Sequence, residues 1–166
     1  MLKNKILLLV FLLCALFAAC EKTPPYEVEK QKELDAITIK KYVDSNNLSM
    51  IVDPSGLNYQ IITPGKGTVY PTPTDSVMVY FQGRLLRASS AFQTVAETDS
   101  LGVNLNYAME GWKIGLSKIT AGGQIRMIIP SALAYKNFTG NGIPPFAILD
   151  YTITLKNIKY KTENTK

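Results

Sequence analysis

The sequence predicts an α+β fold in which an antiparallel sheet wraps around one short helix. Several segments alternate apolar and polar residues, which is the pattern of strands with one covered face. Between two of them, Met109, Trp112 and Leu116 recur at spacings of three and four, the pattern of one face of a short helix. Gly111 and Gly115 leave a bare patch on this helix where a neighbouring backbone can approach closely. Trp112, the only tryptophan, is expected to fill the space between helix and sheet, most simply as a core residue.

The composition allows one ordinary domain with short additions and excludes several kinds of chemistry. The chain has 166 residues, of which 46% are hydrophobic and 19% charged, which is typical of a folded protein. It contains no histidine, and its two cysteines, Cys14 and Cys20, both lie in the N-terminal segment. Zinc sites, cysteine nucleophiles and Ser–His–Asp triads are therefore excluded from the folded domain. We expect neither metal nor cofactor and, because no run of lysine and arginine is interleaved with aromatic residues, no nucleic-acid partner.

The first 19 residues are predicted to be a lipoprotein signal peptide. Lys3 and Lys5 precede an almost unbroken apolar run over residues 6–19, which is too short to span a bilayer comfortably. The run ends with two alanines and Cys20, a pattern that resembles the bacterial lipobox, although Phe17 stands where leucine is usual. The resemblance implies cleavage before Cys20 and acylation of its thiol, so that lipid holds the protein to a bacterial membrane in the cell envelope, at a periplasmic or outer-membrane face. The alternative is an ordinary signal peptide followed by a free cysteine.

Residues 20–53 are predicted to form a lipidated tether followed by a charged helix. Residues 27–46 contain no glycine or proline and are rich in lysine, glutamate, leucine and isoleucine, which favours a helix. The apolar positions are too scattered for a clean stripe, so we interpret this helix as a spacer, with a partner-binding or dimerisation element as the alternatives. The turn residues 53–56 mark the start of the main domain, residues 54–161, and residues 162–166 are expected to be a disordered tail.

The main domain is predicted to consist of strands on both sides of the short helix. The strands are expected over residues 57–61, 75–86, 103–105, 124–129 and 148–160. In the last of these, Tyr151 and Ile153 are expected to face inward, while Asp150 and Thr154 face outward. Residues 87–100 are polar and irregular, and we expect a loop or bulge there. The alternation predicts an antiparallel sheet with one covered face and one solvated face.

These segments, in this order, resemble the FKBP family of peptidyl-prolyl cis–trans isomerases over about residues 55–160. No single motif is specific, and the resemblance rests on the ordered set. The set comprises Ser55-Gly56-Leu57-Asn58-Tyr59, Val79-Tyr80-Phe81-Gln82-Gly83-Arg84-Leu85, Ala91-Phe92, Glu110-Gly111-Trp112, Ile129-Pro130, Leu133-Ala134-Tyr135 and Gly142-Ile143-Pro144-Pro145-Phe146-Ala147. The resemblance implies an FKBP-like half-barrel sheet curled around one short helix, with a pocket for proline-containing polypeptides between them.

The resemblance also implies which residues form that pocket. The expected catalytic residues are Phe81, Phe92, Gln93, Trp112 and Tyr135, and the expected substrate-binding residues are Met109, Ile143 and Tyr151. Trp112 would be the floor under the proline ring, and Ile143 would lie on a mobile loop over residues 136–145. Tyr135 would offer its hydroxyl, and Met109 its backbone N–H, to the backbone of the substrate. For each aromatic residue the alternative is plain core packing.

Two positions depart from the family pattern. An aspartate usually follows the phenylalanine at position 92, and a tyrosine usually stands at position 81, whereas this chain has Gln93 and Phe81. In the family the aspartate accepts a hydrogen bond from that tyrosine, so the paired replacement leaves no buried polar group without its partner. We expect a pocket of intact shape but weaker electrostatics, with reduced isomerase activity and poor affinity for FKBP macrolides. The alternatives are a module that binds proline segments without catalysis, as a chaperone or assembly factor, and a purely structural envelope lipoprotein.

Overall fold

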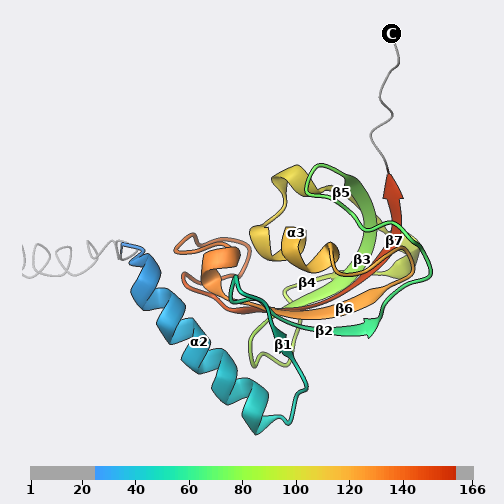
Figure 1. Ribbon diagram of the computed structural model, residues 1–166. Coiled ribbons are helices and arrows are strands. Elements are labelled where there is room, and N and C mark those ends of the chain that lie inside the picture. The colour runs from blue at the N-terminus through green and yellow to red at the C-terminus, as the bar shows by residue number, and fades with distance from the viewer. Residues whose placement is uncertain (1–24, 160–166) are drawn as a thin grey trace, which may run out of the picture.

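The computed structural model describes residues 25–159, and within them the chain forms one antiparallel sheet and two α-helices (Figure 1). The predictions for the signal peptide, for Cys20 and for residues 162–166 lie outside the described residues. The strands lie in the order β1-β2-β6-β7-β3-β4, and β5 also pairs with β3. The elements are α2 (Val28–Ser45), β1 (Ile51–Val52), β2 (Asn58–Thr63), β3 (Ser76–Leu85), β4 (Gln93–Val95), β5 (Leu101–Asn104), α3 (Glu110–Leu116), β6 (Gln124–Ile129) and β7 (Leu149–Lys159). Short 3-10 helices connect them, namely η1 (Glu97–Asp99), η2 (Leu105–Tyr107) and η3 (Ser131–Leu133).

The sheet curves around α3, as the sequence predicts (Figure 1). Trp112 is 6% exposed, and the core around it is built from the inward-facing residues of β3, β6 and β7. A methyl group added to Gly111 would overlap the side chain of Ile129, and one added to Gly115 would overlap Met127. The two glycines therefore let α3 lie directly on β6, but on its side chains and not on its backbone.

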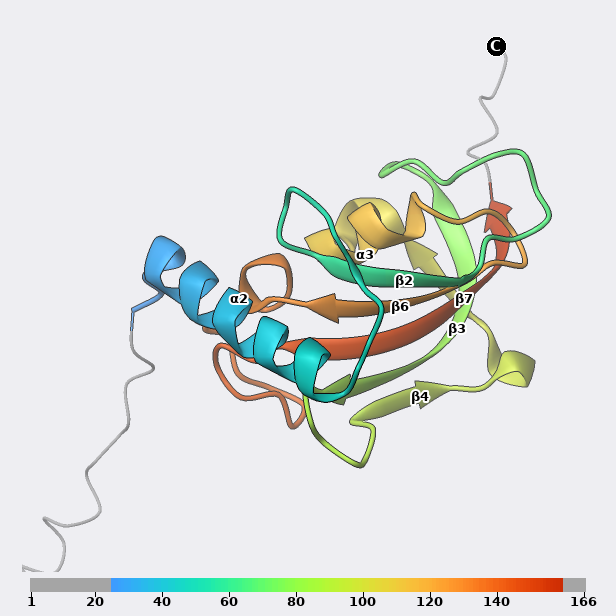
Figure 2. The same ribbon diagram turned by 60° about the horizontal axis from the view of Figure 1, so that its bottom comes forward.

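The helix α2 is not a free spacer, because it packs on the face of the sheet opposite α3 (Figure 2). Ile39 and Asp35 of α2 are 1% and 2% exposed. On the sheet, Asp150 is 1% exposed and accepts hydrogen bonds from Arg126, which also donates one to the Tyr42 hydroxyl of α2. The expectation that Asp150 and Thr154 point to water is therefore wrong, because both are buried: Arg126 links Asp150 to α2, and Gln124 donates a hydrogen bond to Thr154. The rest of this face stays partly solvated, since Tyr80 and Thr152 are half-buried and Gln82 is exposed.

Two edge strands differ from the sequence-based expectation. Residues 87–100 are not a loop throughout, because β4 pairs there with Phe81–Gly83 of β3 and η1 follows it. The strand β1 pairs with β2 and lies N-terminal to residue 54, where the sequence places the start of the domain. Both strands are short edge strands with mostly exposed residues, so they produce no apolar alternation. Among the helices formed by residues 25–159, none combines the length and the apolar character needed to cross a membrane.

An ion pair fastens the turn after β1 to the end of α3. The Lys118 ammonium lies 2.7 Å from the Asp53 carboxylate and also 4.8 Å from the centre of the Tyr59 ring. The hydrogen bond from Lys118, assisted by one from the Ser55 backbone, lowers the pKa of Asp53 from 3.8 to about 2. A carboxyl whose pKa is lower in the folded state stabilises the fold above its unfolded pKa and loses this contribution as the pH falls through its folded pKa.

We therefore expect Lys118→Met to lower the melting temperature at neutral pH, with the difference from wild type shrinking between about pH 4 and pH 2. Thermal denaturation followed by circular dichroism over this range measures the effect. Lys40→Met is the matched control, because Lys40 pairs with Asp44 on the exposed face of α2. A difference that stays constant down to pH 2 would show that Lys118 acts by packing on Tyr59 and not through Asp53.

Candidate functional site

A cavity of about 320 Å³ opens at one end of the curved sheet. None of the side chains that line it carries a charge at neutral pH. They are Phe92, Gln93, Tyr135, Phe138, Gly140, Asn141 and Ile143. Five of these seven residues belong to one loop, residues 135–143, and the other two lie at the start of β4. The cavity therefore has one wall on the sheet and a longer wall on a single loop.

An aromatic cluster connects this cavity to the core. Phe81 of β3, Trp112 of α3 and Tyr151 of β7 are 4%, 6% and 1% exposed. Trp112 meets Phe81 and Tyr151 nearly edge-on, with ring centroids 5.0 and 5.3 Å apart. Phe92, which lines the cavity, meets Tyr151 at 5.8 Å. The structure thus brings together the aromatic residues predicted from the sequence, with Phe92 at the cavity and the other three in the core.

A glycine makes room for the Tyr151 ring of this cluster. Gly83 of β3 stands opposite Tyr151 of β7 in the register of the sheet. A methyl group added to Gly83 would overlap the Tyr151 ring, so this ring lies across the bare backbone of β3. The absence of a side chain at position 83 therefore sets the position of Tyr151 next to Phe81 and Phe92.

The polar groups of the site are few and neutral. Burial, and secondly the neighbouring phenol of Tyr135, raises the pKa of Tyr151 above its usual value. Tyr135 itself is 40% exposed at the cavity, where its side chain can reach a bound molecule. The indole N–H of Trp112 is buried and has no hydrogen-bond partner within residues 25–159. The phenol of Tyr151 therefore stays protonated at neutral pH and carries no charge.

Met109 occupies the N-cap position of α3, with extended backbone. Its carbonyl accepts hydrogen bonds from the N–H groups of Trp112 and Lys113, at 3.0 and 3.3 Å. Its side chain packs against the core and does not line the cavity. The predicted contact of the Met109 backbone with a substrate therefore stays a prediction.

Sequence reasoning missed the tip of the cavity loop. Phe138, which is 68% exposed, Gly140 and Asn141 line the cavity but were not among the predicted site residues. The tip is a tight hairpin, because Gly140 and Ile143 exchange backbone hydrogen bonds of 3.2 and 2.9 Å around Asn141-Gly142. The Asn-Gly pair, with φ of 52° and 77°, is a strong sequence signal for a two-residue turn and could have located it.

A metal site is not apparent in the described part of the chain. Within residues 25–159, no group of three or more His, Cys, Asp or Glu side chains is arranged to hold an ion. The arrangement of the cavity suits an apolar ring of a small molecule or peptide, with hydrogen bonds from neutral groups at its edge.

Comparison with known proteins decides the family. The model of the FKBP-type peptidyl-prolyl cis-trans isomerase family matches residues 67–156, more than half of the chain. The chain belongs to the FKBP family. The match ends within β7 and includes Phe81, Phe92, Trp112 and Tyr135, so the FKBP domain contains the whole aromatic cluster and the cavity.

Bacterial FKBP proteins are similar to this chain in sequence and in structure. The FKBP-type isomerase FkpA of Escherichia coli K12 is 33% identical over 105 residues, which are 63% of this chain and 38% of FkpA. The FKBP-type 22 kDa isomerase of the same strain is 31% identical over 121 residues, which are 71% of this chain and 58% of that protein. The chain therefore spans well under two thirds of the length of these relatives. The crystal structure of E. coli FkpA aligns with a TM-score of 0.67 at 30% identity, covering 79% of this chain and 62% of FkpA.

Proposed function

We propose that this FKBP domain is a peptidyl-prolyl cis–trans isomerase that assists the folding of proline-containing polypeptides. The observation that carries the proposal is the uncharged cavity of about 320 Å³, placed against a buried aromatic cluster. Membership of the FKBP family supports it, as do the relatives in Escherichia coli that carry the isomerase name.

Prolyl isomerisation suits a site of this kind. The reaction rotates one amide bond over a barrier of about 20 kcal/mol and neither makes nor breaks a covalent bond. It therefore needs no nucleophile and no general base, and catalysis consists of binding the twisted amide better than either planar form. A cavity walled by Phe92 and Ile143 removes water from the amide carbonyl, and water stabilises the charge separation that keeps the amide planar.

We assign roles to the residues of the site as follows. The proline ring is assigned to the cavity, against Phe92 and Ile143, which both line it. Trp112 does not line the cavity but touches Tyr151, which touches Phe92, and we assign it as the floor beneath the proline ring. Tyr135 is assigned as the donor of a hydrogen bond to the backbone of the substrate, because its side chain lines the cavity and the residue is 40% exposed. The residues Phe81 and Tyr151 hold the Trp112 ring in place, and the Met109 N–H is available at the start of α3 for a substrate carbonyl.

The activity is expected to be low for the family, because Gln93 and Phe81 replace the usual acidic and phenolic pair. Gln93 lies at the cavity, while Phe81 is buried beside Trp112. We expect the double variant Phe81→Tyr/Gln93→Asp to raise kcat/KM by about tenfold, since a hydrogen bond to a charged acceptor contributes about 1.5–3 kcal/mol and about 1.4 kcal/mol is a factor of ten. A protease-coupled isomerisation assay on residues 21–166 measures kcat/KM of the wild type and of the double variant.

The single variants serve as controls for this pair. Phe81→Tyr alone buries a hydroxyl without its partner, and Gln93→Asp alone adds a charge without a donor, so neither should equal the double variant. A wild type as active as typical family members would show that the charged pair is dispensable. If neither wild type nor double variant catalyses isomerisation but both bind proline peptides, the chain is a binding module, the alternative that the missing pair favours.

We further propose that the protein works in the cell envelope, held by acyl chains on Cys20. The sequence around Cys20 supports this, as do the bacterial relatives. The mass of the membrane-extracted protein is expected to match a chain that begins at Cys20 and carries lipid, and Cys20→Ser is expected to leave the membrane fraction. A mature chain beginning elsewhere, or full retention of Cys20→Ser in the membrane, would rule out the anchor.

A further inference from the structure

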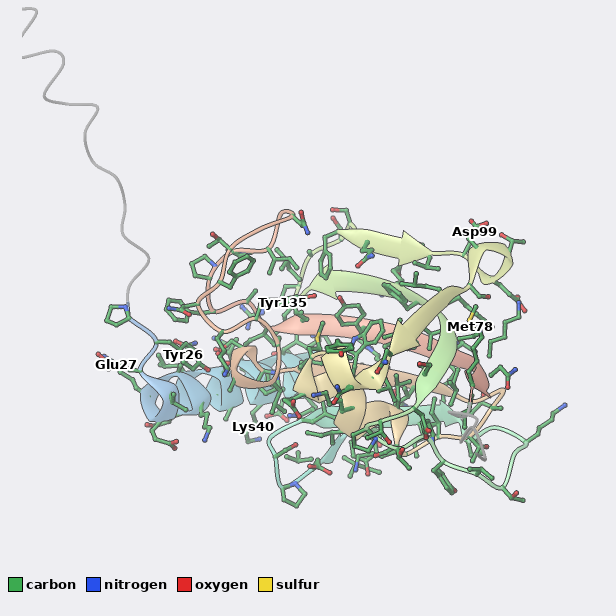
Figure 3. All side chains as sticks on the ribbon, turned by 90° about the horizontal axis from the view of Figure 1, so that it is seen from above. Tyr26, Glu27, Lys40, Met78, Asp99 and Tyr135 are labelled. Atoms are coloured by element: carbon green, nitrogen blue, oxygen red, sulfur yellow. The ribbon has the colours of Figure 1, made fainter. Side chains whose placement is uncertain are left out.

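The loop that lines most of the cavity is fastened at both ends to the N-terminal segment of the domain. Before the loop, Asp35 of α2 accepts hydrogen bonds from the backbone N–H and the hydroxyl of Ser131, both 2.7 Å long. After the loop, Phe146 stacks on Tyr26, with ring centroids 5.8 Å apart. Figure 3 shows Tyr26 at the start of α2, beside the part of the chain that carries Tyr135.

Backbone hydrogen bonds connect these contacts into one network at the base of the loop. The N–H of Lys136 donates to the carbonyl of Ser131 at 2.9 Å, and the N–H of Phe146 donates to the carbonyl of Lys136 at 2.7 Å. The hydroxyls of Tyr26 and Ser131 are 3.4 Å apart. Lys136 and Phe146 have φ of 56° and 59°, in the left-handed region that residues with side chains rarely adopt. A residue with a side chain keeps this left-handed conformation only where the surrounding contacts hold it, so the conformation at the base of the loop depends on this network.

Asp35 is the central hydrogen-bond acceptor of this network. Its side chain is buried, at 2% exposure, and Ser131 is fully buried. One carboxylate oxygen accepts both hydrogen bonds from Ser131, and the other accepts one from the Gln31 amide at 2.7 Å. These three donors are neutral groups. Burying a carboxylate costs free energy that only good hydrogen bonds offset, so this contact fixes Ser131 in one place relative to α2.

We propose that Asp35 is a positioning residue of the pocket. By fixing Ser131, it holds the loop that carries Tyr135 and Ile143 in the conformation that receives a proline ring. The inference rests on the proposed function of the cavity, and it adds α2 to the parts of the chain that determine substrate affinity. Asp35 does not line the cavity, so it affects substrate binding only by keeping the loop in one conformation.

The substitution Asp35→Asn tests the proposal, because it keeps the shape of the side chain and replaces one acceptor oxygen by a donor. In the full chain, we expect Asp35→Asn to speed amide hydrogen exchange at Lys136 and Phe146 about tenfold, with the amides of β6 and β7 unchanged. The dissociation constant of a peptide with one Leu-Pro bond should also rise about tenfold, and KM should change more than kcat. Asp44→Asn is the matched control, since Asp44 lies on the exposed face of the same helix.

A compensating substitution separates positioning from general damage. In the double variant Gln31→Glu/Asp35→Asn, the new glutamate accepts from the asparagine amide, and the asparagine carbonyl is free to accept from Ser131. This variant is expected to restore both slow exchange at Lys136 and wild-type peptide affinity. Should Asp35→Asn fail to fold, Ser131→Ala removes only the hydroxyl donor and should change exchange and affinity in the same direction by about threefold.

The results of these measurements distinguish a positioning role of Asp35 from a purely structural one. Faster exchange throughout β6 and β7 would show that Asp35 merely stabilises the fold, and it would overturn the proposal. Faster exchange confined to the loop, with unchanged peptide affinity, would overturn it as well. If the wild type binds the peptide without isomerising it, the catalytic function fails, while the exchange and affinity results still support or overturn the role of Asp35. A wild type that does not bind the peptide overturns both.

Discussion

Trp112→Ala is expected to lower the free energy of unfolding by about 3–5 kcal/mol and to abolish binding of proline peptides. The indole ring is 6% exposed and touches two other aromatic rings, so its removal leaves a large cavity between α3 and the sheet. The same ring is the proposed floor of the pocket, so the binding site loses its shape together with the core. Urea denaturation followed by circular dichroism measures stability, because the variant has no tryptophan fluorescence.

Two further variants separate the structural role of Trp112 from its role in binding. Trp112→Leu fills part of the volume and should cost less stability, while still weakening peptide binding by an order of magnitude or more. Tyr107→Ala removes an aromatic residue that is 84% exposed just before α3, and it should change stability by less than about 0.5 kcal/mol. A Trp112→Leu protein that binds proline peptides as wild type does would show that Trp112 is core alone.

Asp150→Ala is expected to destabilise the domain by about 3 kcal/mol, the lower end of the cost of breaking a buried ion pair, because it leaves partly buried positive charge without its partner. The carboxylate is 1% exposed and accepts hydrogen bonds of 3.0 and 2.8 Å from the Nε and Nη2 atoms of Arg126. The Nε atom of Arg84, itself buried, lies 3.8 Å from the same carboxylate. Asp150 thus neutralises two arginines beneath α2, and its hydrogen bond raises the pKa of Arg126.

A double-mutant cycle tests this explanation. In the background Arg126→Met, Asp150→Ala should cost clearly less than in wild type, since one of the two stranded charges is gone. Asp44→Ala breaks a well-exposed pair on α2 and should cost less than about 0.5 kcal/mol. Equal costs of Asp150→Ala in both backgrounds would mean that the loss comes from packing and not from the charge of Arg126.

Much of the fold could be predicted because its central elements have one apolar face. The bounds of β6 match the predicted strand, those of β3 differ by one residue at each end, and α3 begins one residue later than expected. The pocket aromatics could be named because the FKBP motifs fix their order along the chain. The sequence could not predict which of these aromatics lines the cavity and which are buried, because this depends on the orientation of the Tyr151 ring and on the missing side chain at Gly83.

The sequence could not predict the attachment of α2, for a physical reason. Of its 18 residues only Asp35 and Ile39 are buried, so no apolar stripe marks the contact face. The contact depends on polar partners far away in sequence, Ser131 for Asp35 and Arg126 for Tyr42, and hydrophobic patterns contain no information about such pairs. The loop tip around Phe138 was missed because an exposed aromatic residue in irregular backbone has no periodicity.

The packing of α2 on the sheet also limits how far the pocket can lie from a lipid anchor on Cys20. If residues 20–53 were all flexible, a lipid on Cys20 would allow the domain to move over about 120 Å, at up to 3.6 Å per residue. Because Tyr26 is stacked on Phe146, next to the cavity loop, the distance from the pocket to a lipid on Cys20 is limited by the covalent length of the few residues between Cys20 and Tyr26, which span at most about 20 Å in any conformation. An acylated protein would therefore present its pocket to polypeptides passing close to the lipid headgroups, and soluble chains deeper in the compartment would meet it only by diffusing to the membrane.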